Sequence, residues 1–275
     1  MVFKNSKAIV YNPACANPAP PKFMAVSAHH DDIEIMAADG IGKGYDNPEA
    51  SFYAVVTTDG GGSARSGPYA DYTDEQMKAV RIKEQQQAAE IGRYHRLVLL
   101  NYTSADVKNK ADTDITDDYV QILKEVRPEI VYTHNICDKH PTHVGVVLKM
   151  IEACRRLPAE LRPAKLYGCE VWRDLDWLDD GDKVLFDLSG QVELTDKLLT
   201  VFDSQVAGGK RYDLATAGRR RANATYAQSH AVDTVTAMGY AMDLTPLIKD
   251  PDADIAEFAA AHIDKFKADV MKNLK

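Results

Sequence analysis

Residues 23–33 read FMAVSAHHDDI, in which an apolar run is followed at once by four ionisable side chains. The run 23–28 is short and apolar, as buried parallel strands are, and the charged residues after it favour the end of a strand. Three further runs have the same character: FYAVVTT at 52–58, RLVLLN at 96–101 and EIVYTH at 129–134. The sequence therefore predicts four buried strands, the first of which ends at a polar cluster.

Helical patterns separate these strands, near residues 33–44, 74–92 and 116–126, and the second begins at Thr73 with the capping-box pattern TDEQ. Strands that alternate with helices predict an α/β fold: a Rossmann-like, doubly wound, mostly parallel sheet with helices on both faces. If the four strands follow the order 3-2-1-4, the first and fourth are neighbours, and the loops that follow them face each other.

The second half of the chain is less regular. It contains strand-like runs at 165–172 and 183–188 and helical patterns near 191–206, 211–228 and 254–273. We expect a single domain over residues 1–275, with an extended lead-in at 1–21 and a less regular C-terminal extension over about 175–275.

The composition is that of an ordinary globular protein, with 45% apolar and 27% charged residues and a net charge of −8. This charge gives no reason to expect nucleic acid or an anionic membrane as a partner, and the one dense basic run, GRRRA at 218–222, favours a solvated helix face or an anion contact. No apolar run approaches the ~20 residues that a membrane span needs, and no signal peptide is recognisable. A cytoplasmic location and four reduced cysteines are expected.

Five of the eight histidines fall in two segments, AHHDD at the end of the first strand and THNICDKHPTH after the fourth. In an open α/β sheet these segments would meet beyond the carboxyl ends of the strands, where ligands bind. The crevice would hold imidazole and carboxylate groups suited to a catalytic zinc ion. Its members would be His29, His30, Asp31, Asp32, His134, Asp138, His140 and His143.

Simpler interpretations exist for parts of these segments. Asp31 or Asp32 could cap the following helix, and His134 could be a buried histidine of the core. Cys137, which lies between His134 and His140, is a rival metal ligand because thiolates bind zinc well.

Several motifs along the chain resemble the PIG-L/LmbE family of zinc-dependent N-acetylglucosamine deacetylases. AHHDDIEI at 28–35 is similar to the family's AHPDD segment, and DKHPTH at 138–143 to its HPDH segment. RIKEQQQAAEIG at 81–92 resembles the family helix with the pattern RxxExxxAxxLG. The resemblance extends well over about residues 22–170 and only weakly beyond.

The resemblance implies a role for six residues. His29, Asp32 and His143 would hold one zinc ion per chain, Asp31 would be the general base, and His140 would assist at the transition state. Arg81 would contact the sugar, although it could also be a charge on the helix surface.

Two positions depart from the family pattern. His30 replaces the usual proline, and we expect it to be a bulky exposed residue, although it could instead add a donor to the site or displace His29 as a ligand. Thr142 replaces the usual aspartate, which puts in doubt how a histidine of the site is oriented.

The sequence thus predicts a metal-dependent N-deacetylase that hydrolyses the acetamide of an N-acetylglucosamine-type sugar or conjugate. A zinc-activated water would attack, with an aspartate as general base. Two alternatives stay open: a metal-dependent phosphoesterase that holds two ions, and a non-catalytic module that binds metal or sugar. The resemblance also makes a homo-oligomer possible.

Overall fold

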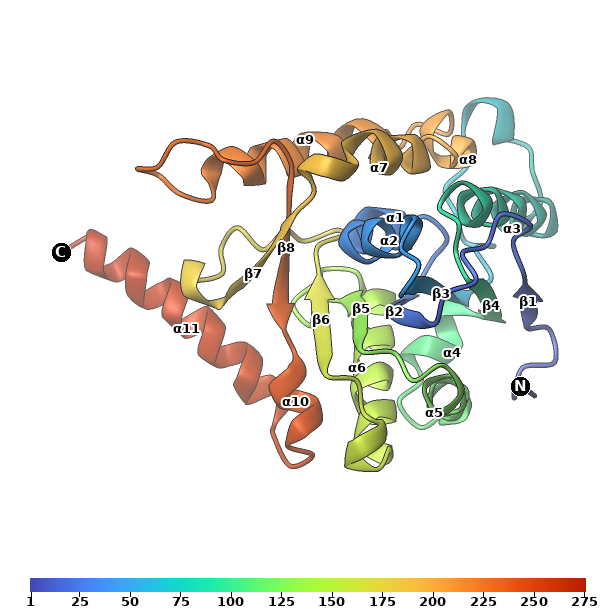
Figure 1. Cartoon of the computed structure of the whole chain (residues 1–275), viewed down its shortest axis with the longest axis horizontal. Helices are drawn as coiled ribbons and strands as arrows, with labels where there is room; N and C mark the ends of the chain where they lie inside the picture. The colour runs from blue at the N-terminus through green and yellow to red at the C-terminus, as the bar shows by residue number, and fades with distance from the viewer.

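The computed structural model describes residues 1–275, and its centre is one eight-stranded sheet with the order β1-β4-β3-β2-β5-β6-β8-β7 (Figure 1). The strands from β4 to β6 in this order are parallel, whereas β1, β8 and β7 run antiparallel to their neighbours. The strands are β1 (Ile9–Tyr11), β2 (Pro21–Ser27), β3 (Ser51–Thr58), β4 (Arg96–Tyr102), β5 (Ile130–His134), β6 (Lys165–Cys169), β7 (Lys183–Asp187) and β8 (Met238–Asp243).

The expected α/β architecture and the expected order of the first four strands are confirmed. β2 lies between β3 and β5, so the chain turns from one half of the sheet to the other there. The loops that follow β2 and β5 therefore lie side by side, at the position where doubly wound sheets bind their ligands.

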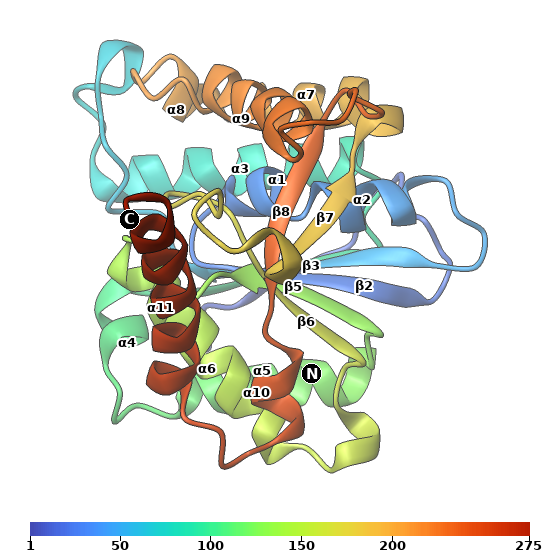
Figure 2. The same ribbon diagram turned by 90° about the vertical axis from the view of Figure 1, so that its left-hand side faces the viewer.

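Helices cover both faces of the sheet (Figures 1 and 2). The layer beside β2 and β3 contains α1 (Asp32–Met36), α2 (Ala38–Tyr45) and α3 (Asp74–Ile91), and outside it lie α7 (Val192–Leu199), α8 (Asp203–Val206) and α9 (Tyr212–Tyr226). The opposite layer contains α4 (Ser104–Lys108), α5 (Asp114–Val126), α6 (Pro141–Arg156) and α10 (Thr245–Lys249). The last helix, α11 (Ile255–Asn273), has no buried residue.

Side chains alternate between the two faces of β2, as the two-residue period of a strand requires. Met24 and Val26 pack into the core on the α5 and α6 side, whereas Ala25 packs into the core on the α1 and α2 side. Each face thus has its own apolar core, and the polar residues of the 28–32 segment begin where this packing ends.

Several elements differ from the sequence-based expectation. The helix expected at 33–44 is divided at Ala37 into α1 and α2, and a helix at 141–156 and a strand at 238–243 were not predicted. Strand β8 carries a glycine and a terminal aspartate and follows a long loop, so its pattern alone is weak.

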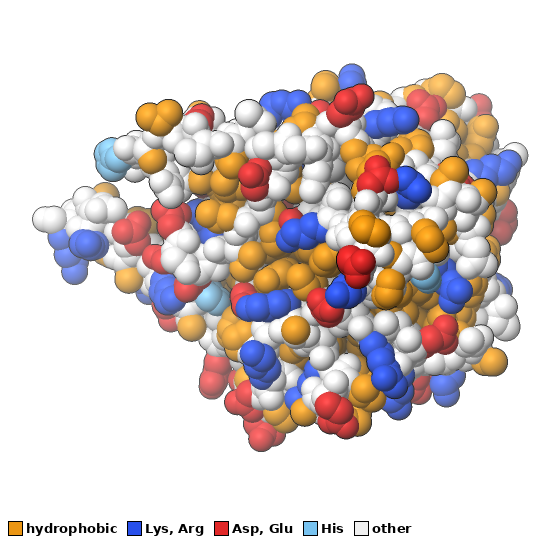
Figure 3. Space-filling view, viewed as in Figure 1, with side chains coloured by type: hydrophobic (Ala, Val, Ile, Leu, Met, Phe, Trp, Pro, Cys, Tyr) orange, Lys and Arg blue, Asp and Glu red, His pale blue; other side chains and the backbone are white.

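No helix is long and apolar enough to cross a bilayer. On the face shown in Figure 3, acidic and basic side chains are interspersed among apolar ones.

Candidate metal centre

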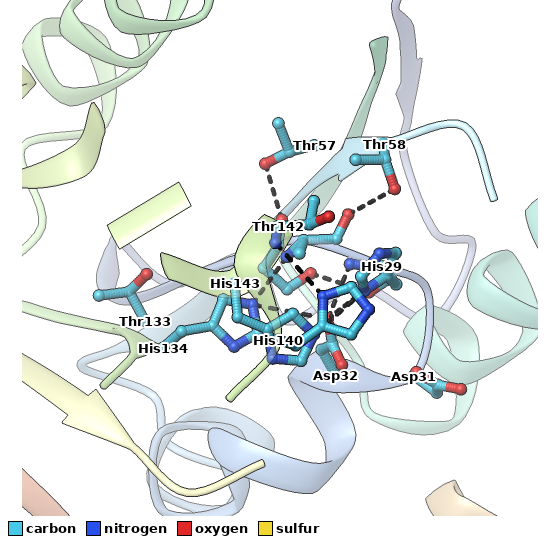
Figure 4. Close-up of polar contacts among 12 residues, drawn as sticks. His29, Asp31, Asp32, Thr57, Thr58, Thr133, His134, His140, Thr142 and His143 are labelled. Carbon is cyan, nitrogen blue, oxygen red and sulfur yellow. Dashed lines mark hydrogen bonds and ion pairs between the residues drawn. The ribbon is translucent and has the colours of Figure 1, made fainter. Parts of the chain in front are cut away.

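Two loops bring the two histidine segments together. His29 to Asp31 connect β2 to α1, and His140 is the N-cap of α6, shortly after the end of β5 at His134. In Figure 4 the side chains of His29, Asp32, His140 and His143 converge on one region. All members of the expected crevice except His30 belong to this cluster or lie against it.

Three donor atoms form a nearly regular triangle. His29 Nδ1 lies 3.1 Å from His143 Nε2 and 3.3 Å from Asp32 Oδ2, and the distance from His143 Nε2 to Asp32 Oδ2 is 3.4 Å. A tetrahedral zinc ion bound at about 2.0–2.1 Å requires donor separations of about 3.3 Å. His29, Asp32 and His143 therefore fit one face of a tetrahedral site.

His134 lies beside this triangle but its ring nitrogen is already used. The backbone N–H of Ala28 donates to His134 Nε2 over 2.8 Å, so this nitrogen accepts and the proton is on Nδ1. The ring also stacks on that of His143, at 3.9 Å between centroids. His134 thus packs against His143, which is one of the three donors, and its Nε2 is not free to bind a metal ion.

The electrostatics keep Asp32 ionised. Burial alone would raise the pKa of its carboxyl group, but His143, His29 and His134 hold that pKa below its usual value. Conversely, burial would lower the pKa of His143, whereas Asp32 and Asp138 raise it. Asp32 thus stays negatively charged, and its charge favours positive charge on the neighbouring His143.

Asp138 supplies the carboxylate that the threonine at 142 lacks. Its Oδ2 lies 3.5 Å from His143 Nδ1, and its two oxygens accept N–H groups of His140 and Trp172. A carboxylate on the far nitrogen of a histidine keeps the near nitrogen unprotonated and aimed at the metal. Asp138 thus brings a carboxylate to His143, and the backbone N–H groups of His140 and Trp172 hold it there.

Asp31 is oriented differently from Asp32. Its side chain points away from the histidines in Figure 4, and its Oδ2 accepts from Arg81 Nη2 at 3.1 Å. Burial raises the pKa of Asp31 to about 6, against the opposing effect of Arg81. Its backbone has φ 85°, a left-handed conformation rare for residues other than glycine, asparagine and aspartate. The 28–32 turn thus separates the two carboxylates in space.

Arg81 is buried, with 2% of its surface exposed, rather than a charge on the helix surface. It comes from α3 and donates to Asp31 and to the backbone carbonyl of His30, while its Nε and Nη1 have no partner. It also lines the cavity described below. Its contacts place it next to Asp31, and its Nη1 lies 4.0 Å from Glu84 Oε2.

His30 is fully buried, so the expectation that it is an exposed substituent is wrong. A Cβ built on Gly60 would lie 3.0 Å from His30 Nδ1, which shows how tightly the ring packs against that loop. Burial, with the charge of Arg81, lowers the pKa of His30 well below its usual value. Because Gly60 has a positive φ and no side chain, it leaves the space that this ring fills.

A cavity of about 630 Å³ opens beside the triangle. His29, Asp31, Asp32 and His140 lie at one end, and Trp172, Lys210 and Tyr212 belong to the wall contributed by the second half of the chain. No sequence motif marks the last three residues, because they come from loops and from the start of α9, which only the tertiary fold brings to the site.

His140 offers a hydrogen-bond donor to this cavity. Its Nδ1 accepts from the backbone N–H of Thr142 at 3.3 Å, so the proton of the neutral ring is on Nε2. Burial, with His143 and His29, lowers the pKa of His140 to about 4. The neutral imidazole is therefore the form favoured by this site. Two groups of side chains could hold a metal ion, one of His29, His140 and His143 and one of Asp32, His134 and His143, and Cys137 belongs to neither.

Comparison with known proteins agrees with this geometry. Residues 24–154 match the family model described as PIG-L: GlcNAc-PI de-N-acetylase. This range contains His29, Asp31, Asp32, Arg81, His140 and His143. No curated protein sequence is significantly similar to the chain.

Solved structures share the fold at low sequence identity. The N,N'-diacetylchitobiose deacetylase of Pyrococcus horikoshii has a TM-score of 0.66 and 18% identity, over 88% of this chain and 91% of that one. The 4-carboxy-2-hydroxymuconate hydratase of Pseudomonas putida KT2440 has a TM-score of 0.63 and 16% identity, over 81% of this chain and 96% of that one. The A40926 pseudoaglycone deacetylase has a TM-score of 0.60 and 13% identity, over 81% of this chain and 96% of that one. Because this fold also occurs in a hydratase, the reaction must be argued from the site.

Proposed function

We propose, on the premise that residues 24–154 belong to the PIG-L family, that this chain is a metal-dependent deacetylase that hydrolyses the acetamide of an N-acetylglucosamine-type sugar or conjugate. The observation that carries the proposal is the triangle of His29 Nδ1, Asp32 Oδ2 and His143 Nε2, with separations of 3.1–3.4 Å, at the end of a cavity large enough for a sugar. These residues would hold one zinc ion. When bound, zinc lowers the pKa of a coordinated water and polarises a carbonyl group.

The chain's own residues supply the proton transfers. Asp31 is adjacent to Asp32 in the sequence, but its carboxylate is not one of the three donors. It therefore remains basic and can take a proton from the attacking water. Arg81 fixes the orientation of Asp31 through Nη2 and limits how far the carboxylate can rotate. A general base typically contributes 10²–10⁴-fold to the rate, and its position must be well defined to do so.

His140 would stabilise the oxygen of the tetrahedral intermediate. Its Nε2–H is a fixed donor, because the Thr142 N–H occupies the other ring nitrogen. A neutral donor of this kind stabilises developing negative charge without having to be protonated first. In this role His140 acts as a neutral donor rather than as an imidazolium cation, in agreement with the lowered pKa of its ring.

The two-metal phosphoesterase is less well supported. The two groups of side chains that could hold an ion both contain His143, and His134, which would have to serve a second ion, already accepts the Ala28 N–H. A site for one ion favours hydrolysis of an amide over the two-metal form of phosphoryl transfer.

The decisive experiment measures metal content and product together. The protein should bind one divalent ion per chain by elemental analysis and release acetate and a free amine from one or more of a panel of N-acetyl sugars and conjugates. Activity should disappear with a chelator and return with zinc. Full activity in metal-free protein, or two ions with release of phosphate from phosphate esters, would contradict the proposal.

A further inference from the structure

The second half of α11 carries a stripe of exposed apolar side chains. Twelve large apolar side chains are exposed on the whole chain, and five of them lie within these three turns of helix: Ile263, Phe266, Val270, Met271 and Leu274. Their spacing of three and four residues places them along one side of the helix. Single exposed apolar residues are ordinary on a protein surface, whereas a contiguous group of them indicates a contact surface.

The first half of α11 fixes the helix to the rest of the molecule. Phe258 packs against the core, and His262 Nδ1 lies 3.1 Å from Asp182 Oδ2. Phe266 meets the ring of Trp177 at 6.5 Å, and every residue after it is exposed. In Figure 1 the C-terminal end of the helix projects beyond the sheet on the side of β7. The helix is thus anchored at one end and presents its apolar stripe on the outside.

An unpaired edge of the sheet adjoins this helix. β7 is the last strand and pairs only with β8, and Asp182, which holds α11, directly precedes it. The bond from the Leu188 N–H to the Ala237 carbonyl continues the ladder between the two strands, so alternate residues of β7 bond to β8. The others turn their backbone groups outward, namely Lys183, Leu185 and Asp187. An exposed strand edge of this kind is a template for pairing with another chain.

The stripe is too small to hold a partner by itself. Twelve residues of helix are about 18 Å long, and a face about 10 Å wide has a footprint of roughly 200 Å². A stable protein interface buries about 800 Å² on each partner. A partner that binds the stripe must therefore also cover the adjoining edge of β7, where the side chain of Leu185 is 46% exposed.

The charges beside the stripe match a reversed copy of the same helix. At about 100° per residue, Asp264 and Lys267 lie on the same flank of the stripe, about one turn apart. Glu257 and Lys275 continue this order on that flank, with acidic residues first and basic residues later. Two antiparallel copies would place Asp264 of each beside Lys267 of the other, whereas parallel copies would bring like charges together. Such self-complementarity is the property of a two-fold interface.

We propose that the apolar stripe of α11 and the outer edge of β7 together bind a second copy of the chain about a two-fold axis, with the two α11 helices antiparallel. This surface lies apart from the donor triangle, and the inference does not depend on the reaction proposed above.

A membrane is a less suitable occupant of the stripe. Helices that lie on anionic lipid carry mainly basic residues on their polar face. In α11, Glu257, Asp264 and Asp269 interrupt the lysines, and the chain as a whole has a net charge of −8. A second copy of the helix is complementary to both signs of charge.

Sedimentation equilibrium of the full chain tests the surface. The wild-type protein should sediment with twice the mass of one chain. Ile263→Glu and Leu185→Glu should each raise the dissociation constant at least about tenfold, because each would bury a carboxylate without a partner, twice by symmetry. Val10→Glu is the matched control, a similarly exposed apolar residue on β1 at the opposite edge of the sheet, and should leave the dimer intact. Circular dichroism should be the same for all variants, since these side chains are exposed.

Exchanging two charges tests the antiparallel arrangement. Asp264→Lys and Lys267→Asp should each weaken the dimer by about fivefold to tenfold, because each brings like charges together at two symmetry-related positions. The double variant restores opposite charges and should recover the wild-type dissociation constant within about twofold. A double variant as weak as the single ones would overturn the antiparallel pairing.

Other outcomes would overturn the second copy altogether. They are a chain that remains monomeric up to about 100 µM, which is weaker than specific interfaces of standard size, or a dimer whose dissociation constant is unchanged in Ile263→Glu. A monomer that instead binds vesicles of phosphatidylserine, more tightly as Asp264→Lys and more weakly as Lys267→Asp, would show that the stripe contacts a membrane and that the proposal is wrong.

Discussion

Asp31 and Asp32 are adjacent in the chain, yet the structure gives their carboxylates different surroundings. Asp32 faces three histidines, whereas Asp31 faces Arg81. The separation depends on the left-handed backbone at Asp31, where φ is 85°. Asparagine tolerates this conformation nearly as well as aspartate, so Asp31→Asn is a gentle replacement.

We therefore predict a division of labour between the two aspartates. Asp31→Asn should keep the metal and the fold but lose about 10²–10⁴ in kcat, the usual contribution of a general base. Asp32→Ala should lose metal affinity and recover part of its activity at high zinc concentration. Metal content and kcat are measured for both variants. If Asp31→Asn loses the ion while Asp32→Ala retains it, the two assignments must be exchanged.

His134 provides a second test at the scale of a residue, because composition alone would make it a ligand. Its Nε2 accepts from Ala28, and the ring is fully buried. His134→Gln offers another acceptor and should retain about one ion per chain, whereas His143→Gln should lose it. His134→Ala should retain metal but cost about 1–3 kcal/mol of stability, because it leaves the buried Ala28 N–H without a partner. Loss of metal in His134→Gln would make His134 a ligand.

The residues that sequence reasoning identified are those with fixed spacing along the chain. His29 and Asp32 are three residues apart, as are His140 and His143, and the fold places all four in one cluster. Sequence reasoning could not identify the role of Asp138, because its contact with His143 depends on the path of the loop before α6. It also misjudged His30, since burial of that ring depends on the space left by Gly60, a residue of a different loop.

At the scale of the elements, α1 is a five-residue helix that depends on its neighbours for its position. Gln85 and Tyr94 donate to Glu34 Oε1, and Gln85 Oε1 accepts from the Asp31 N–H. The same helix α3 that carries Arg81 thus holds both the start and the middle of α1. A short helix has little stability of its own, so these contacts determine where the 28–32 turn lies.

The carboxyl group of Glu34 makes the stability of the contact between α1 and α3 dependent on pH. Burial raises the pKa of Glu34 to about 8, partly offset by the hydrogen bond from Tyr94. The folded chain therefore holds a proton that the unfolded chain releases, so this contribution is complete below about pH 4.5 and is lost as pH rises through about 8. In chelator-treated protein, unfolding by urea between pH 5 and 9 should show a falling stability that is flatter in Glu34→Gln. Parallel curves for the two proteins would contradict the raised pKa.

The basic run at 218–222 illustrates how one sequence pattern can contain three different environments. Arg219 lines the cavity, Arg221 pairs with Asp196 at the surface, and Arg220 is buried. The solvated helix face expected from the sequence is thus correct for Arg221 only. Arg220 Nη2 donates to the backbone carbonyls of Glu34 and Ile35, which lie near the end of α1.

We predict that Arg220→Met destabilises the protein by about 1.5–3 kcal/mol, because it removes charged hydrogen bonds to two buried carbonyls. Arg221→Met is the matched control, since an exposed ion pair contributes about 0–1 kcal/mol. Urea denaturation of both variants measures the difference. Equal stabilities would mean that the bonds from α9 to α1 are not needed to hold this helix.

At the scale of the whole molecule, the second half of the chain adds strands to the same sheet as the first half rather than forming a separate unit. The family match ends at residue 154, but β6 pairs with β5 over five residues, and β8 pairs with β6. The parallel half of the sheet could be predicted from its apolar runs. The antiparallel edge could be predicted only in part. The run at 183–188 indicated β7, but β8 is short and partly polar, and the pairing of β7 with β8 joins residues from distant segments.

We therefore propose that residues 1–275 fold as a single cooperative domain, and this can be tested by truncation. Removing residues 261–275 takes away the end of α11, which is exposed except for the partly buried His262. The deletion loses the contacts of His262 and Lys265 with Asp182 and of Phe266 with Trp177, and it should leave metal binding and a single unfolding transition. Removing everything after residue 164 deletes β6 and β8, exposes the edge of β5 and opens the cavity wall that contains Trp172 and Lys210. That fragment should lack a cooperative transition in calorimetry and should not bind zinc tightly. If it instead unfolds cooperatively with one bound ion, the first 164 residues are a domain in their own right and the rest is an addition to it.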